Sequence, residues 1–345
     1  MSKNCSLAET GELLKAAKKL VIVSHVSPDG DTLGSSLALM HALRALGKDV
    51  IMNVDDDIST VYSFLPGIQE YRRFGADETI EADLLVIIDA SSADRAGNAM
   101  EVVRPGAVLN IDHHKTNTRF ADYLYLDSDA AATAEIIYAL LLEMGIEFTT
   151  DIATCIYEGI YTDTGSFKYS NTTSKTMETA AALLKHGVNP SLVSDNMELR
   201  SRSQVEMLRK VLETLTFLKD GKIAYIEIAP ELYDRNVDTD AFISYPRYIE
   251  GVEIALLFKQ PEENLTRVSF RSKEIDVAKI AVSFGGGGHK KAAGCSIYAP
   301  MKEAEKLCCR LLRICLYDGR YRKCPQAARY DIPRCGKPDP SNLRS

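Results

Sequence analysis

The first half of the chain alternates short apolar runs with stretches of helical periodicity. The apolar runs predict buried strands, and they occupy residues 21–23, 50–54, 84–88 and 107–111. Residues 6–19 and 32–46 follow a helical pattern instead. Continuous apolar strands separated by helices are typical of a sheet that is covered on both faces. The pattern therefore predicts an α/β domain with a mostly parallel sheet and helices on both of its faces.

Local signals mark the ends of the predicted helices. Ser6 and Glu9 have the spacing of a capping box, and Gly47 is suited to end the helix at 32–46. Further helices are predicted at residues 131–144, 151–163 and 175–186. In the second of these, a four-residue spacing places Asp163 at the end of an apolar stripe. A carboxylate in that position points inward and requires a cation.

The pattern changes after Gly187-Val188-Asn189-Pro190, which interrupts the helical periodicity. Beyond this point we predict a mixture of strands and helices, with a helix at 201–215, strands at 222–228, 252–259 and 265–271, a helix at 277–284, a strand near 295–298 and a helix at 301–316. The mixture predicts a smaller C-terminal α+β domain. The expected boundaries are an N-terminal domain at 1–188, a linker at 189–200, a second domain at 201–318 and a C-terminal tail at 319–345.

Composition narrows the range of functions. A chain of 345 residues with 46% hydrophobic and 26% charged residues is long enough for two domains with their own cores. The formal charge of −7 gives no general attraction for polyanions, so a long nucleic acid bound along a basic groove is not expected. The apolar runs are too short to span a membrane. The eight cysteines show no CxxC spacing, and we expect a reduced, cytoplasmic protein.

Metal-binding side chains follow several of the predicted strands. The triplet Asp112-His113-His114 comes directly after one apolar run, and Asp89 comes directly after another. Ligands bind beyond the carboxyl ends of the strands in sheets of this kind. The other candidates are His25, Asp29 and Asp31 after the first strand, and Asp163 at the end of its helix. Five acids and several imidazoles match the ligand demand of two divalent ions, which can clamp the oxygens of a phosphoryl transfer.

Some of these residues also have structural interpretations. Asp31 precedes a predicted helix and could cap it, and Asp89 could be a turn residue at a strand end. Phe167 and Tyr169 could stack a base or belong to the core. Arg95 could contact a phosphate or pair with its neighbour Asp94.

A glycine run in the second domain suggests an anion site. Gly285-Gly286-Gly287-Gly288 is followed by His289 and Lys290, and consecutive glycines can form a nest of backbone N–H groups around an anion. The spacing does not match a Walker motif. Arg271, which closes a predicted strand of the same domain, and the next residue Ser272 are further candidates for contacts with substrate phosphate. A flexible loop is the alternative interpretation of the glycines.

Together these motifs resemble the DHH superfamily of phosphoesterases with a C-terminal DHHA1 domain, and most closely its nano-RNase/PAP-phosphatase group. The resemblance covers most of the chain. It implies that His25, Asp29 and Asp89 hold one Mn²⁺, and that Asp31, Asp89, His113 and Asp163 hold a second, with Mg²⁺ as the other candidate ion. It further implies that His114 faces the scissile phosphate, that Asp112 orients a histidine, and that Arg271, Gly285, Gly286, Gly287, Gly288 and His289 bind the terminal phosphate or nucleotide.

The function expected from this resemblance is hydrolysis of very short oligoribonucleotides to mononucleotides, with removal of the 3′-phosphate of 3′-phosphoadenosine 5′-phosphate (PAP) as a further activity. Asp89, His114 and Asp112 are the expected catalytic residues. Partners would be short RNAs or small nucleotides and no membrane, with a homodimer as one arrangement. A phosphodiesterase for linear or cyclic dinucleotides, or a catalytically silent nucleotide sensor, are the alternatives.

Overall fold

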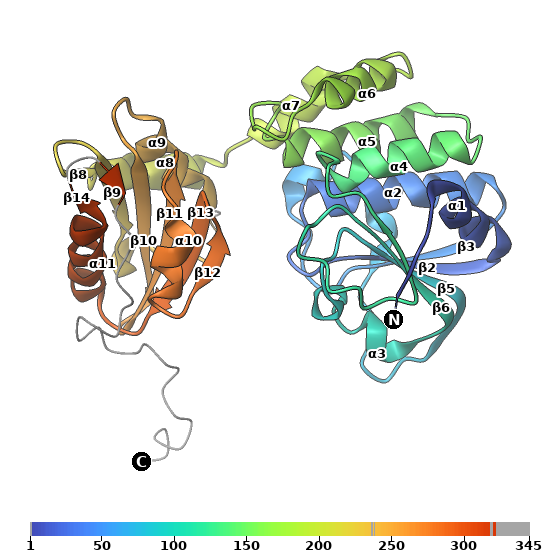
Figure 1. The fold of residues 1–345 in the computed structure, drawn as a ribbon, viewed down its shortest axis with the longest axis horizontal. Coiled ribbons are helices and arrows are strands. Elements are labelled where there is room, and N and C mark those ends of the chain that lie inside the picture. The colour runs from blue at the N-terminus through green and yellow to red at the C-terminus, as the bar shows by residue number, and fades with distance from the viewer. Residues whose placement is uncertain (1, 236, 238, 318–319, 322–345) are drawn as a thin grey trace. The chain divides into compact units, whose positions relative to one another are not determined.

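The computed structural model describes residues 2–235, 237, 239–317 and 320–321. The chain divides into two compact units, the first ending at Leu199 and the second beginning at Arg200 (Figure 1). The tail predicted at 319–345 lies outside the described residues, apart from Arg320 and Tyr321.

The first unit is built on a seven-stranded sheet in which every neighbouring pair is parallel. The strand order is β1-β7-β6-β5-β2-β3-β4. The strands are β1 (Lys3–Asn4), β2 (Lys19–Ser24), β3 (Asp49–Asn53), β4 (Tyr71–Arg72), β5 (Ile80–Ile88), β6 (Val103–Asp112) and β7 (Tyr123–Leu126). The chain runs from β2 through β3 and β4 toward one edge and then returns to place β5 on the other side of β2. This reversal creates a topological switch point between β2 and β5.

Helices cover both faces of this sheet, as predicted, although very unequally (Figure 1). One face is packed by α1 (Leu7–Ala16), α2 (Gly30–Ala45), α4 (Thr133–Glu143) and α5 (Thr150–Asp163). The other face carries α3 (Ala99–Val102) and the 3₁₀ turn η3 (Ala93–Ala96). The remaining elements are α6 (Ser174–Leu184), α7 (Pro190–Glu198), η1 (Thr60–Tyr62) and η2 (Ile68–Glu70).

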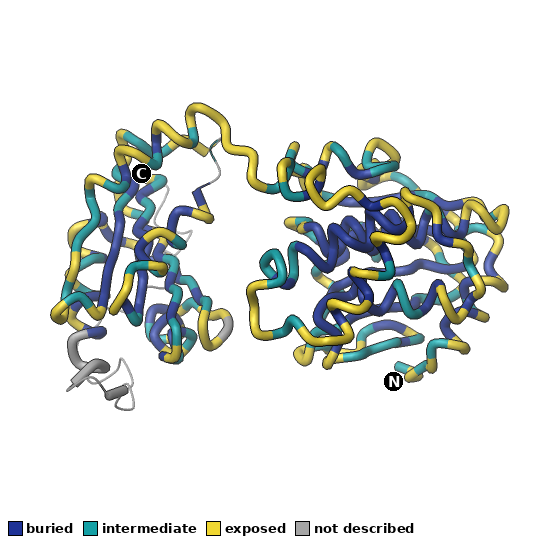
Figure 2. Tube along the Cα trace, turned by 90° about the horizontal axis from the view of Figure 1, so that it is seen from above, coloured by how far each residue is buried: buried dark blue, intermediate teal, exposed yellow. Residues whose placement is uncertain are grey.

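Alternate residues of the central strands enter two separate cores. Ile22 and Val86 belong to the larger core under α2 and α5, whereas Val21 and Ile87 belong to the smaller core near α3. The central strands are therefore buried on both faces. In Figure 2 the interior of this unit is accordingly coloured as buried. This explains why the sequence shows continuous apolar runs instead of an alternating pattern. The α/β prediction is confirmed.

Several elements differ from the prediction. The short strands β1, β4 and β7 were not expected, because they contain two to four residues and lack a long apolar run. The segment at 189–200, predicted as a linker, contains α7. This helix begins at Pro190 after the cap residue Asn189, and its Val193 is buried in the larger core of the first unit.

The second unit is a six-stranded mixed sheet with helices. Its order is β12-β13-β11-β10-β9-β8, where only β9 and β10 are parallel neighbours. The strands are β8 (Thr216–Leu218), β9 (Ile223–Ile228), β10 (Ile254–Glu262), β11 (Leu265–Ser272), β12 (Gly287–His289) and β13 (Ala292–Ile297). The helices are α8 (Arg202–Leu212), η4 (Pro230–Leu232), η5 (Asp240–Ile243), α9 (Ser244–Tyr248), α10 (Val277–Val282) and α11 (Met301–Cys315), followed by a hairpin of β14 (Leu316–Tyr317) and β15 (Arg320–Tyr321).

Helix α11 and helix α10 pack against one face of this sheet, while residues from α8 and η5 pack against part of the other. A smaller domain that combines strands and helices was predicted, and this prediction is confirmed. None of the helices within the described part of the chain is both long and apolar enough to cross a membrane.

One ionisable residue in the core of the first unit gives a prediction about stability. Glu158, on α5, is fully buried, and neither carboxylate oxygen has a hydrogen-bond partner among the described residues. Burial raises the pKa of Glu158 to about 8 from its usual 4.5. The folded state therefore holds the proton more tightly than the unfolded state, and stability falls as the pH rises from about 4.5 through about 8.

Glu158→Gln removes this penalty because the amide stays neutral at every pH. Relative to the unchanged chain, the free energy of unfolding of the metal-free variant should rise by up to a few kcal/mol between pH 4.5 and pH 9. Urea denaturation at both pH values measures this difference, and exposed Glu143→Gln on α4 is the control. An equal effect of both substitutions at both pH values would contradict the assignment of a buried, protonated Glu158.

Candidate metal centre

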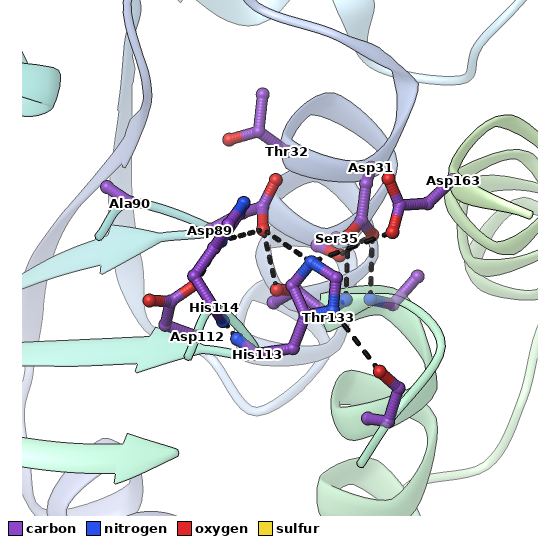
Figure 3. Close-up of polar contacts among 12 residues, drawn as sticks. Asp31, Thr32, Ser35, Asp89, Ala90, Asp112, His113, His114, Thr133 and Asp163 are labelled. Atoms are coloured by element: carbon purple, nitrogen blue, oxygen red, sulfur yellow. Dashed lines mark hydrogen bonds and ion pairs between the residues drawn. The ribbon is translucent and has the colours of Figure 1, made fainter. Parts of the chain in front are cut away.

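The predicted ligands meet at the carboxyl ends of three adjacent strands. His25 follows β2, Asp89 follows β5 and Asp112 ends β6. These strands are neighbours in the order β6-β5-β2, so their ends lie side by side at the switch point of the sheet. Figure 3 shows Asp89 and Asp112 close to His113, His114, Asp31 and Asp163. In open parallel sheets, ligands bind beyond the strand ends at such a switch point. The fold thus explains why residues far apart in sequence converge.

Asp89 is at the centre of this convergence and adopts an unusual backbone conformation. Its φ angle is +59°, a left-handed conformation that costs free energy for a non-glycine residue. The side chain is almost fully buried, and its Oδ1 accepts a hydrogen bond of 2.8 Å from the hydroxyl of Thr133. Strain retained at a strand end is typical of functional sites. The turn directs the carboxylate toward three histidines.

In both His25 and His113, one ring nitrogen lies near a backbone carbonyl oxygen and the other lies near carboxylates. The Nδ1 atom of His25 lies 2.9 Å from the carbonyl oxygen of Val26, and its Nε2 lies 3.5 Å from Asp89 Oδ2 and 3.7 Å from Asp29 Oδ1. The Nδ1 atom of His113 lies 3.2 Å from the Ala130 carbonyl oxygen. Its Nε2 lies 3.6 Å from Asp89 Oδ1. A backbone carbonyl that holds one ring nitrogen leaves the other available to an ion, as in many metal sites.

Arg95 also contacts the His25 ring, which the sequence did not reveal. Its Nη2 lies 2.9 Å from His25 Nδ1. That nitrogen can accept from Arg95 or donate to Val26, and only the second arrangement leaves the lone pair of Nε2 for an ion. Burial lowers the pKa of His25, but Asp29 and Asp89 outweigh burial and raise this pKa to about 9. A metal ion at this position must displace a proton, so binding should weaken as the pH falls.

Asp31 is held by the start of a different helix from the one that contains it. The alternative interpretation of Asp31 as the cap of α2 is wrong, because Asp29 is the cap and accepts from the Thr32 N–H at 3.1 Å. The buried carboxylate of Asp31 instead accepts backbone N–H groups of Thr133 at 2.6 Å and Ala134 at 2.8 Å, where α4 begins. The positive end of that helix stabilises the negative charge.

Several carboxylates of this region repel one another. Burial, together with Asp89 and Asp163 nearby, raises the pKa of Asp31 well above its usual range. Burial and the neighbouring Asp89 also raise the pKa of Asp163 to about 6, although His113 acts in the opposite direction. His113 Nε2 lies 3.6 Å from Asp163 Oδ2. Divalent cations relieve this kind of crowding, because each positive ion favours the charged form of the surrounding carboxylates.

Asp112 is oriented differently and acts on His114. Its Oδ1 lies 2.7 Å from His114 Nδ1 and accepts the backbone N–H groups of His113 and His114. Its Oδ2 accepts a hydrogen bond of 2.6 Å from Asn117 Nδ2, a residue that the sequence analysis did not single out. Asp112 is fully buried and His114 is partly exposed. The pair therefore fixes one imidazole at the rim of the site.

Among the described residues, three groups of side chains have ligand atoms close enough to share an ion. The atoms in each group lie within 4.8 Å of one another. The groups are His25, Asp29 and Asp89; Asp31, His113 and Asp163; and Asp89, His113 and His114. Asp89 belongs to two of them. Imidazole nitrogens combined with carboxylate oxygens suit ions such as Mn²⁺, Fe²⁺ or Zn²⁺ better than an all-oxygen set would.

The segment after Asp163 contains aromatic residues of unequal exposure. Phe167 packs edge-on against Tyr157 and Tyr161, so it belongs to the core and not to an exposed stacking surface. Tyr169 is 51% exposed. Asn171 donates to the Asp163 carbonyl oxygen at 3.1 Å and holds this segment against α5.

The glycine run of the second unit differs from the predicted anion nest. The N–H of Gly285 donates to the Val282 carbonyl and that of Gly286 to the Ala281 carbonyl, with Gly285 at φ +76°. This is a Schellman motif that ends α10. These two N–H groups are used inside the protein and cannot cradle an anion. Gly287 and Gly288 continue into β12, so the flexible-loop alternative is also wrong.

The other residues of the second unit that were predicted to contact the substrate differ in their exposure. Arg271 is partly exposed, and its guanidinium donates to the Phe270 carbonyl oxygen at 3.0 Å. Ser272 is fully buried and donates to the Ile275 carbonyl, so it presents no surface to a substrate. The backbone of His289 ends β12, and its side chain lies outside the described residues.

Comparison with known proteins places both units. Residues 19–160 match the DHH family, N-terminal domain, and residues 220–312 match the DHHA1 domain. The chain is 36% identical over 327 residues to the bifunctional oligoribonuclease and PAP phosphatase NrnA of Thermus thermophilus, which covers 94% of both chains. It is 27% identical to the Bacillus subtilis protein of the same name over 86% of this chain and 94% of that one.

A solved structure agrees with this assignment. An exopolyphosphatase-related protein from Bacteroides fragilis superposes with a TM-score of 0.83 and 28% identity, covering 89% of this chain and 95% of the other. With both domain models matched in order and the converging His and Asp residues at the strand ends, the chain belongs to the DHH family of phosphoesterases and carries a C-terminal DHHA1 domain.

Proposed function

We propose that this protein hydrolyses very short oligoribonucleotides to mononucleotides, and that it also removes the 3′-phosphate of PAP. The observation that carries the proposal is the convergence of imidazoles and carboxylates around Asp89 in a chain related along nearly its whole length to bifunctional oligoribonuclease and PAP phosphatases. One site can serve both reactions, because each is the hydrolysis of a phosphoester.

The donor set fits two divalent ions. His25, Asp29 and Asp89 would hold one ion, and Asp31, His113 and Asp163 would hold the other with Asp89 shared between them. We propose Mn²⁺, because imidazoles are present beside the carboxylates, with Mg²⁺ as the other candidate. When bound, such ions lower the pKa of water and stabilise the charge that develops on phosphoryl oxygens.

The protein itself positions the reacting groups. His114 lies at the rim of the site, and we propose that it contacts the scissile phosphate as a hydrogen-bond donor and cation. Asp112 favours the charged form of this imidazole and fixes its orientation, and Asn117 fixes Asp112 in turn. Such a pre-arranged donor stabilises a phosphate in the transition state without reorganisation.

We assign the roles of the two parts by the same argument. Residues 1–188 would be the catalytic domain and residues 201–318 the substrate-binding domain, joined through 189–200. Arg271 would contact substrate phosphate, and the side chain of His289 is a further candidate. The net charge of −7 gives no general attraction for long polyanions, which favours substrates of a few nucleotides.

The test of the substrate class compares labelled RNAs of two to five nucleotides with a 24-nucleotide RNA, in the presence of Mn²⁺. The proposal predicts mononucleotide products and much faster turnover of the short RNAs, and phosphate release from PAP in a parallel assay. Equal rates on short and long RNA would contradict the length restriction. Hydrolysis of cyclic dinucleotides alone would assign the protein to a different phosphodiesterase activity.

Asp89→Asn tests the proposed shared ligand. Asparagine tolerates the left-handed backbone of this position, so the substitution removes the charge with little change in the fold. Loss of a residue that only orients a metal ligand typically lowers activity by up to ~100-fold. Because Asp89 is proposed to be a ligand itself, turnover should fall by more than ~100-fold. Exposed Asp77→Asn is the control. A fully active Asp89→Asn protein with a normal melting temperature would show that Asp89 is not a ligand.

Asp112→Asn tests the link between Asp112 and His114. The hydrogen bond to Asp112 raises the pKa of His114. A neutral amide does not stabilise the imidazolium, so the pKa of His114 should fall toward 6.5 in the variant. NMR titration of the metal-free protein measures this pKa, with Asp77→Asn as the control. An unchanged pKa of His114 would contradict the proposed coupling.

A further inference from the structure

A pocket of about 560 Å³ opens on the sheet of the second unit. Neighbouring positions of three strands line it, with Lys259 of β10 paired with Arg267 of β11, and Arg267 paired with Ser296 of β13. Gly285 and Gly286 also line it. None of the described residues that line the pocket is acidic. In a chain of net charge −7, a pocket with cations and without carboxylates is suited to an anion.

The two cations of this pocket are not equivalent. The Nζ atom of Lys259 lies 2.5 Å from Asp240 Oδ1, so its charge is largely paired. Arg267 is exposed, and no hydrogen bond or ion pair joins its guanidinium to any group in the described part of the chain. Its planar donors match the geometry of a phosphate group. Arg267 is therefore the residue of this pocket that can bind a phosphate at little cost.

Other side chains of the pocket are suited to the remaining parts of a nucleotide. Ser269 lies two residues from Arg267 on the same face of β11, and the Ser296 hydroxyl lies on the paired strand. Both can donate to phosphate oxygens. Tyr298 lines the same pocket and is 39% exposed, and an exposed tyrosine ring can stack a base. Gly294 also lines the pocket, and a Cβ added there would only reach ordinary contact with the Val268 carbonyl oxygen, 3.4 Å away.

We propose that this pocket binds one nucleoside monophosphate unit, with the phosphate on Arg267 and Ser296 and the base on Tyr298. The site is separate from Arg271, which lies four residues along β11. Its role as a subsite for one end of a short oligonucleotide rests on the proposed function, but the binding itself does not. The DHHA1 domain would then select substrates that carry a phosphate at a fixed place.

The test measures binding of 5′-AMP by calorimetry in EDTA, so that the metal centre does not contribute, with adenosine as the uncharged comparison. The unchanged chain should bind 5′-AMP clearly more tightly than adenosine. Arg267→Ala should weaken 5′-AMP binding by roughly tenfold or more, the typical effect of losing a hydrogen bond to a charged group. Arg209→Ala, on exposed α8, is the control.

A second pair of variants keeps the inference testable even if Arg267→Ala does not fold. Ser296→Asp places a carboxylate opposite Arg267 on an exposed strand position and should weaken 5′-AMP binding, whereas the isosteric, neutral Ser296→Asn should have a much smaller effect. Unchanged 5′-AMP binding in both Arg267→Ala and Ser296→Asp would overturn the inference. Equal loss in the aspartate and asparagine variants would also overturn it, because charge would then not be the cause.

A parallel assay separates this inference from the proposed function. Hydrolysis of bis-p-nitrophenyl phosphate with Mn²⁺ reports on the metal centre without a nucleotide. If the pocket acts as proposed, this hydrolysis stays unchanged in Arg267→Ala while 5′-AMP binding is lost. A protein that hydrolyses no phosphoester but still loses 5′-AMP binding in Arg267→Ala would refute the enzyme function and retain the nucleotide site.

Discussion

The structure depends on one electrostatic constraint: several carboxylates must share a small buried volume at the ends of parallel strands. Left alone, Asp31, Asp89 and Asp163 would repel one another, and burial would add to the cost of their charge. The fold offsets part of this cost with neutral and positive groups. The start of α4 donates N–H groups to Asp31, the Thr133 hydroxyl donates to Asp89, and imidazoles surround the cluster. What remains is a demand for cations, and this demand defines the site.

The same constraint explains which parts could be predicted from the sequence. The strands that deliver His25, Asp89 and Asp112 are buried on both faces, so each appears as an apolar run with its polar residue at the end. Their convergence follows from the rule for parallel sheets. The contact of Asp31 with α4 could not be predicted, because it joins groups about a hundred residues apart. Asn117 was not predicted either, because a single asparagine after a metal motif forms no spacing or periodicity that would indicate its role.

The glycine run shows where a pattern leads to the wrong structure. Four consecutive glycines permit either an anion nest or a tight helix end followed by a close strand, and nothing local distinguishes the two. In the structure a Cβ at Gly286 would lie 2.1 Å from the Gly294 carbonyl oxygen, so packing accounts for that glycine. Under the proposed function, anion recognition in the second unit therefore rests on side chains. Alternate side chains of a strand point to the same face, so Arg267, Ser269 and Arg271 lie on one face of β11. This period-two pattern is present in the sequence, but the predicted anion site did not include it.

The proposed chemistry requires that the strand-end cluster binds two ions and that Asp89 contacts both. Crystals grown with Mn²⁺ and measured at the manganese absorption edge test this most directly, because anomalous scattering locates each ion without reference to the protein. The two-ion proposal predicts two anomalous peaks, one near His25 and Asp29 and one near His113 and Asp163, with Asp89 between them. A single peak, or peaks that lie away from these side chains, would contradict it.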